Sequence, residues 1–154
     1  MKKAFYKTLY LLAYGFWYLL ALLPFPVLYL FSDVFYLIMA YIVKYRHKVI
    51  GKNLRNSFPE KTDAELRRIE QGFYHWFCDY VVETFKLMTM SREQLMERMT
   101  FTGTEELNRL LSEGRSVAVY LGHLGNWEWI TSLPYWVEDS VCCQIYHPLE
   151  NEYF

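Results

Sequence analysis

The feature that most constrains this chain is an uncharged run of 25 residues near its start, Thr8 to Ser32, which reads TLYLLAYGFWYLLALLPFPVLYLFS. A helix needs about 20 apolar residues to span a bilayer, so the run is long enough to enter a membrane. Pro24 and Pro26 interrupt it and leave 16 residues before the break. Those residues make about 24 Å of helix, against a hydrocarbon core of about 30 Å. The sequence leaves two arrangements open, a kinked span and a re-entrant hairpin.

A cleaved signal peptide is a third interpretation of this region, because Lys2 and Lys3 precede the apolar run. No small-residue cleavage site follows the run, and Pro24 and Pro26 stand where such a site belongs. The pattern therefore favours a segment that stays attached to the protein.

Charge is distributed unevenly along the 154 residues, although the net charge is only -1. Residues 1–57 hold eight Lys and Arg against one acid, whereas residues 58–154 hold eight against sixteen. In the basic part, a second apolar run over residues 34–43 ends at the cluster Lys44, Arg46, Lys48, Lys52 and Arg55. Basic charge beside apolar runs favours anionic lipid over nucleic acid as the partner, and the cytoplasmic side for the cluster. We predict that residues 1–43 form a membrane-associated helical anchor.

Aromatic residues and cysteines agree with this placement. Phe, Trp and Tyr make up 19% of the chain, which suits a protein at a membrane interface, where amphipathic rings settle. The three cysteines, Cys78, Cys142 and Cys143, are odd in number and two are adjacent, so they suggest no disulfide framework. A reducing, cytosol-facing location fits them best.

A long amphipathic helix is predicted after residue 62. Thr62 and Glu65 form a capping box, and apolar residues follow at helical spacing, namely Leu66, Ile69, Phe73, Trp76, Phe77, Tyr80 and Val81. His75, Asp79 and Glu83 share one stripe of this helix, and such a stripe is typical of a solvated, salt-bridged face. Two shorter helices follow, one starting at Ser91 and one opened by Thr104.

The pattern changes after residue 116. The runs VAVYL (Val117 to Leu121) and VCCQIY (Val141 to Tyr146) are β-prone, and the 19 residues between them can hold the crossover helix of a βαβ unit. We predict an α/β fold class, in which the anchor and a helical segment precede the start of an α/β domain. On this prediction the second domain covers residues 44–154.

The stretch YLGHLGNWEW, at the end of the first predicted strand, is the best candidate for a reactive site, because ligands of open α/β sheets bind where strands end. Gly122 and Gly125 allow an unusual backbone, and Asn126 is a good N-cap for a helix starting near Trp127. With His123 in the loop and Glu128 in the first turn, the carboxylate can hold one imidazole nitrogen while the other faces a cleft. The alternative is that Glu128 merely suits a helix start and His123 merely fills a polar turn.

The rest of the sequence offers no better catalytic centre. No Gly-x-Ser-x-Gly motif marks a nucleophilic serine, no His-Glu-x-x-His motif marks a metal site, and no glycine loop is built to cradle phosphate. Cys142 and Cys143 lie within a predicted strand, where cysteine is usually part of the core. The chemistry indicated is a histidine base without a protein nucleophile, which suits attack by a substrate hydroxyl on an activated acyl group.

The segment GHLGNWE resembles the His-x4-Asp/Glu signature of the bacterial lipid A late acyltransferases, the lauroyl and myristoyl transferase family related to the glycerolipid acyltransferases. The apolar N-terminus and the segments RHKVIGKNLRNSFPE, FYHWFCDYVVETFKL and IYHPLENEYF also look like their counterparts in that family, so the resemblance covers essentially the whole chain.

The resemblance implies a fatty acyl transfer without a cofactor or metal. His123 would be the general base on an acceptor hydroxyl of a lipid A precursor, Glu128 its charge partner, and an acyl carrier protein thioester the donor. It also implies the bacterial inner membrane as the location, with the catalytic part on the cytoplasmic side. Gly122, Gly125 and Asn126 would support the motif.

One departure from the family is length, because its members run to nearly twice these 154 residues. Their later half supplies more of the sheet and basic residues thought to hold the phosphorylated acceptor. The chain therefore looks like the N-terminal half of an acyltransferase, and we expect it to be truncated. Two alternatives stay open: an acyltransferase acting on another glycolipid or phospholipid, and a non-catalytic membrane-associated fragment.

Overall fold

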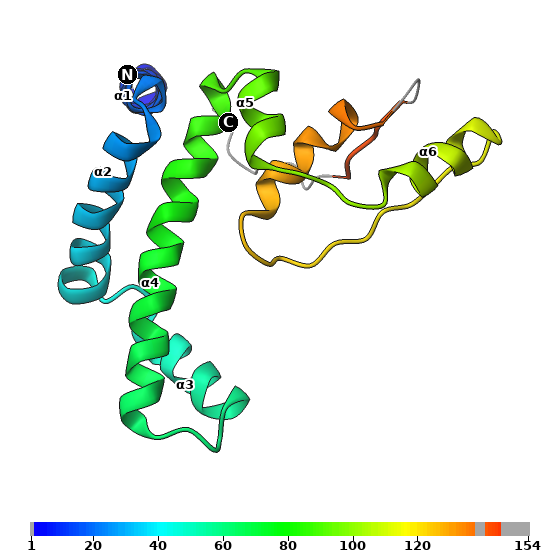
Figure 1. The fold of residues 1–154 in the computed structure, drawn as a ribbon. Coiled ribbons are helices and arrows are strands. Elements are labelled where there is room, and N and C mark those ends of the chain that lie inside the picture. Colours follow the sequence, from blue (N-terminus) through cyan, green and yellow to red (C-terminus); the bar gives the residue numbers. More distant parts are fainter. Residues whose placement is uncertain (1, 138–140, 146–154) are drawn as a thin grey trace. The chain divides into compact units, whose positions relative to one another are not determined.

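The computed structural model describes residues 2–137 and 141–145 of the chain (Figure 1). The chain divides into two compact units, of which one is Leu20–Lys86 and the other combines Met1–Leu19 with Leu87–Phe154. The first unit contains the contacts between the apolar segment and the long amphipathic helix. The second contains the candidate reactive motif.

The long uncharged run is broken at the prolines, as the sequence predicts. Helix α1 (Lys2–Leu22) ends before Pro24, and α2 (Phe25–Leu37) begins after it. Pro24 is the N-cap of α2 with extended backbone, and Pro26 lies in the first turn, where its missing N–H costs no hydrogen bond. Among the described residues, the helix long and apolar enough to cross a membrane is not the predicted run but Phe25–Val43.

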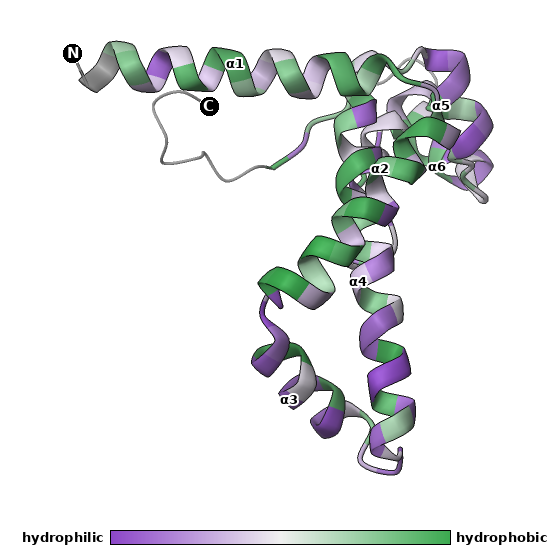
Figure 2. Ribbon diagram, turned by 90° about the vertical axis from the view of Figure 1, so that its left-hand side faces the viewer, coloured by the Kyte–Doolittle hydropathy of each residue, from purple (hydrophilic) through white to green (hydrophobic). Residues whose placement is uncertain are grey.

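Helix α2 continues into a short π-helical segment, η1 (Ile38–Val43), and the chain then turns sharply. Lys44 and Arg46 both adopt left-handed backbone conformations, with φ values of 52° and 50°. Neither is glycine, so the turn stores a little backbone strain. It leads into the basic helix α3 (His47–Ser57), and Figure 2 shows the change from apolar α2 to polar α3.

The predicted amphipathic helix is α4 (Asp63–Lys86), and its predicted capping box is confirmed. The Thr62 backbone N–H donates to the Glu65 carboxylate at 2.8 Å, and the Glu65 N–H donates to Thr62 Oγ1 at 3.4 Å. Helices α2 and α4 lie side by side (Figure 1). Phe25 and Leu28 of α2 and Cys78 and Val82 of α4 are buried, as is Ala21 near the end of α1.

The second unit continues from α4 through a 3-10 turn, η2 (Leu87–Thr89). Helix α5 (Arg92–Arg98) starts with a full capping box between Ser91 and Gln94, as predicted, and α6 (Thr104–Ser112) opens at the predicted threonine. A 3-10 helix, η3 (Trp127–Tyr135), follows at the position predicted for a crossover helix. Pro134 lies inside it.

The predicted α/β fold class is wrong for the described residues. Residues 117–121 and 141–145 form no strand, and the rest of the described chain is helical or irregular. Tyr146, the last residue of the second predicted strand, lies outside the described residues. A β-prone run becomes a strand only when a neighbour takes its backbone hydrogen bonds, and the two runs do not pair with each other here. The described structure is a helical assembly, without the predicted βαβ unit.

Candidate functional site

The predicted motif lies in the second unit, in the loop that leads into η3. The Leu124 backbone N–H donates to the Gly122 carbonyl at 2.9 Å, which closes a tight turn around His123. Gly125 adopts a left-handed conformation with φ of 60°, as its predicted role requires. Gly122 does not, and Asn126 precedes η3 without a side-chain cap. The loop thus places His123 inside the tight turn and before the left-handed Gly125, whereas Glu128 follows Gly125.

His123 is exposed, and its ring packs against a tryptophan. The centroids of the His123 and Trp127 rings are 4.9 Å apart, with an edge-on angle of 69°. Within the described residues, no hydrogen bond or ion pair joins His123 to Glu128. The structure therefore brings both residues to one loop but does not bring the imidazole and the carboxylate into contact, and their catalytic pairing stays a prediction.

Glu128 is half-buried in the first turn of η3, and η3 is held in place by its buried side. Trp129 and Ser132 are buried, and the Ser132 hydroxyl donates to the Trp129 carbonyl at 2.8 Å. Helix α5 packs against η3, where the Arg92 guanidinium stands over the Tyr135 ring at 5.1 Å. This packing fixes the helix that carries Glu128, whereas the loop before it is open to solvent.

The segment after η3 is tied to α6. The Trp136 ring meets the Phe101 ring edge-on at 6.4 Å, and the Asn108 side-chain amide donates to the Trp136 carbonyl at 3.4 Å. These contacts hold the C-terminal end of η3, where Tyr135 and Trp136 lie. Near the start of η3 Trp129 is buried, and the exposed imidazole of His123 lies in the loop before it.

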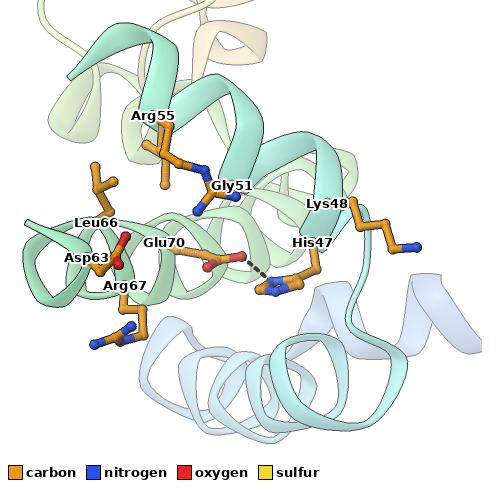
Figure 3. Close-up of a pocket in the computed structure, with 9 residues that line it drawn as sticks. His47, Lys48, Gly51, Arg55, Asp63, Leu66, Arg67 and Glu70 are labelled. Carbon is orange, nitrogen blue, oxygen red and sulfur yellow. Dashed lines mark hydrogen bonds and ion pairs between the residues drawn. The ribbon is translucent and has the colours of Figure 1, made fainter. Parts of the chain in front are cut away.

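The other unit contains a pocket of about 320 Å³ between α3 and α4 (Figure 3). The ring nitrogen Nδ1 of His47 on α3 lies 2.5 Å from the carboxylate of Glu70 on α4. Arg55 and Arg67 also line it, together with Asp63. The His47–Glu70 pair could not be predicted from the sequence, because its members are 23 residues apart on different helices. The pocket contains none of the motif residues and mixes both signs of charge, so we assign it no part in the acyl chemistry.

Comparison with known proteins identifies the chain through its sequence. The family model for bacterial lipid A biosynthesis acyltransferase matches residues 1–135. No curated protein and no solved structure matches the chain significantly. The family match covers the anchor region, α4 and the whole GHLGNWE motif, all of which the sequence analysis linked to such an enzyme.

Proposed function

The chain belongs to the bacterial lipid A biosynthesis acyltransferase family, and we propose that it moves a fatty acyl chain from an acyl carrier protein thioester to a hydroxyl of a lipid A precursor. The observation that carries this proposal is the extent of the match, which runs from residue 1 to residue 135 and so includes His123 and Glu128. Acyl transfer from a thioester needs a base and a polarised carbonyl, and the proposal involves no cofactor.

His123 is the general base in this proposal. One imidazole nitrogen takes the proton of the acceptor hydroxyl while the hydroxyl oxygen attacks the thioester carbonyl carbon. The C–O bond of the new ester forms and the C–S bond breaks, and the departing thiolate takes the proton from the imidazolium. The exposed position of His123 in the loop supports this role, since two substrates must reach its ring.

Glu128 is the charge partner of His123. A carboxylate beside the second ring nitrogen fixes the tautomer and stabilises the imidazolium that forms during transfer. The role requires the carboxylate to come within hydrogen-bond reach of His123 when substrates bind, as catalytic hydrogen bonds are often long in free enzymes. The left-handed turn at Gly125 supports this, because it bends the chain between the two residues.

We place the reaction at the cytoplasmic face of the bacterial inner membrane. Residues 1–43 supply the association, and the apolar helix Phe25–Val43 within them supports it. The basic residues from Lys44 to Arg55 follow that helix directly, and basic segments of this kind remain on the cytoplasmic side. The lipid acceptor then lies in the same leaflet of the membrane that the chain contacts.

The test is turnover of a complete acyltransferase that contains these 154 residues, with acyl carrier protein thioester and lipid A precursor as substrates. His123→Ala should lower the rate roughly 10² to 10⁴-fold, and Glu128→Gln should be less severe, since the amide can hold the ring but not stabilise its charge. The double variant should be little worse than His123→Ala, because both residues serve one proton transfer. His47→Ala and Glu113→Gln are matched controls outside the motif and should keep normal turnover.

Two outcomes contradict the proposal. Near-normal turnover of His123→Ala would show that His123 is not the base and that GHLGNWE is only a structural turn. Mass spectrometry of the acylated lipid tests the acceptor separately: acyl addition to a phospholipid, with the lipid A precursor unchanged, would overturn the acceptor while leaving the role of His123 intact.

A further inference from the structure

A line of polar contacts runs along the interface between α2 and α4. On α4 it uses the stripe that sequence analysis placed in solvent, and on α2 it uses the polar residues of a mostly apolar helix. We call these six residues the polar ladder: Tyr29, Ser32 and Asp33 of α2 with His75, Asp79 and Glu83 of α4. The stripe is ion-paired, as its pattern indicates, but it faces a helix.

The contacts of the polar ladder follow one another at successive turns. Tyr29 donates to the Glu83 carboxylate at 2.8 Å, and Ser32, which is almost fully buried, donates to Asp79 at 2.6 Å. The two nitrogens of His75 lie 3.1 Å from the Asp33 carboxylate and 3.2 Å from that of Asp79. On α2 these contacts span Tyr29 to Asp33, little more than one helical turn, whereas on α4 they extend from His75 to Glu83.

A second side of α2 and η1, about 100° round the helix from the polar ladder, is apolar and has no partner among the described residues of its unit. The exposed fractions of Leu30, Val34, Leu37 and Ile42 are 64%, 57%, 54% and 75%. These residues recur every three to five positions, so they form a continuous strip, and Figure 2 shows the apolar character of α2 and η1. We call these four residues the apolar face.

The polar ladder argues against a crossing of the bilayer by Phe25–Val43. Asp33 lies near the middle of that segment, so a crossing would carry it to the bilayer centre together with His75. Ionisable side chains within spans are rare, and they face the interior of a helix bundle. Here the side chains of Asp33 and His75 are 57% and 52% exposed, at the edge between the polar ladder and the apolar face. That arrangement suits the headgroup level.

The charges that follow the apolar segment identify the surface it meets. Lys44, Arg46, Lys48, Lys52 and Arg55 lie on the turn and on α3, within twelve residues of the end of η1. Basic clusters next to an apolar helix are attracted to anionic lipid headgroups. Tyr41 and Tyr45, both exposed, flank the end of η1 with rings of the kind that settle at membrane interfaces.

We propose that Phe25–Val43 lies in the plane of an anionic lipid surface, with its apolar face among the acyl chains and its polar ladder at the headgroups, instead of crossing the membrane. The inference rests on the membrane association proposed above and specifies its geometry. This geometry is neither the kinked span nor the re-entrant hairpin, because both ends of the segment stay at the same depth in the membrane.

The depth of four side chains in the bilayer tests this geometry. Cys142 and Cys143 are replaced by serine, the fully buried Cys78 is retained, and one cysteine at a time is placed at Leu30, Val34, Leu37 or Ile42. Each is labelled with a polarity-sensitive fluorophore, and the full chain is bound to vesicles of phosphatidylglycerol and phosphatidylethanolamine that carry quenchers at shallow and deep chain positions. The unsubstituted Cys78 background is the labelling control.

The two geometries predict different depth profiles. Lying in the plane, the four reporters have one shallow depth, about 5–10 Å below the headgroup boundary. In a crossing helix, Val34 lies deepest and Ile42 lies roughly 12 Å from it along the axis, so the depths differ strongly. A profile of the second kind overturns the inference. Reporters that resist lipid quenchers while the chain dimerises overturn it too, since a second copy would then cover the apolar face.

Vesicle composition separates this inference from its premises. Lys48→Gln with Lys52→Gln should weaken binding to anionic vesicles roughly thirtyfold and leave binding to neutral vesicles unchanged. Absence of binding to any vesicle would contradict the membrane association itself. His123→Ala should not alter the depth profile, so a failure of the proposed chemistry would be recognised apart from a failure of the proposed geometry.

Discussion

Lys86 offers the sharpest test of how the first unit is held together. Its side chain is 6% exposed, and its ammonium donates to the Ala21 carbonyl at 2.8 Å and to the Leu23 carbonyl at 2.9 Å. These carbonyls lie where α1 ends and the chain turns towards Pro24, so α1 cannot satisfy them itself. The ammonium also stands over the Phe25 ring at 5.8 Å. One cation therefore closes the junction between two helices and α4.

We expect Lys86→Met to lower the free energy of unfolding by about 2–4 kcal/mol. Hydrogen bonds to charged groups contribute about 1.5–3 kcal/mol each, and Lys86→Met removes two of them. The methionine side chain offsets part of this lost stability, because it no longer buries a charge and its stem still packs in the same place. With a urea dependence of about 1–3 kcal/mol per molar, the unfolding midpoint should fall by on the order of 1–2 M.

The measurement is urea unfolding of the chain in mild detergent, followed by the helical circular dichroism signal. Lys61→Met is the matched control, because the Lys61 ammonium also stands over a phenylalanine ring, Phe58, at 5.7 Å. Within the described residues that ammonium donates to no carbonyl, and the hydrogen bond from the Lys61 backbone N–H to the Phe58 carbonyl is unaffected by the substitution. It should change the midpoint little. If the two variants lose the same stability, the carbonyl hydrogen bonds contribute nothing and the argument for Lys86 fails.

Two further predictions concern a buried thiol and a helix cap. Burial raises the pKa of Cys78 to about 11, so its thiol stays protonated below that pH. Maleimide at pH 7.5 should therefore modify the exposed Cys142 and Cys143 and spare Cys78 until denaturant is added. Rapid labelling of all three thiols in the native protein would contradict the packing of α4. Ser91→Ala removes the capping box of α5 and should lower the free energy of unfolding in urea by about 1 kcal/mol. Ser112→Ala is the control. Equal losses in the two variants would show that the capping box does not stabilise α5.

The helix starts of this chain could be predicted because capping is a local interaction. Thr62 reaches Glu65, and Ser91 reaches Gln94, each across three residues of one turn, so a four-residue pattern contains the whole interaction. The break at Pro24 is equally local, since proline restricts its own backbone and that of its neighbour. These features required no knowledge of what packs against the helices.

The failure of the α/β prediction has the opposite cause. Residues 117–121 have the composition of a buried strand, but strand formation depends on a second backbone at hydrogen-bonding distance, and no local pattern supplies it. The same limit applies to the stripe on α4. Its spacing at 75, 79 and 83 was readable, whereas its partner α2 is more than 40 residues away in sequence. In the motif, likewise, the spacing places His123 and Glu128 near one turn but does not set the distance between imidazole and carboxylate.

An in-plane anchor answers a requirement of the proposed reaction. The donor thioester arrives from water on a soluble carrier, whereas the acceptor hydroxyl belongs to a lipid, so the base must act at the boundary between the two phases. A single crossing helix fixes a chain to the membrane at one point and leaves it free to rotate. A helix that lies in the plane of the membrane also fixes the orientation of the chain about the membrane normal. The hydrogen bonds from Tyr29 and Ser32 to α4 then hold that 24-residue helix in a set orientation relative to α2. The polar ladder thus gives α4 a defined orientation to the lipid surface, which an enzyme working at that surface can use.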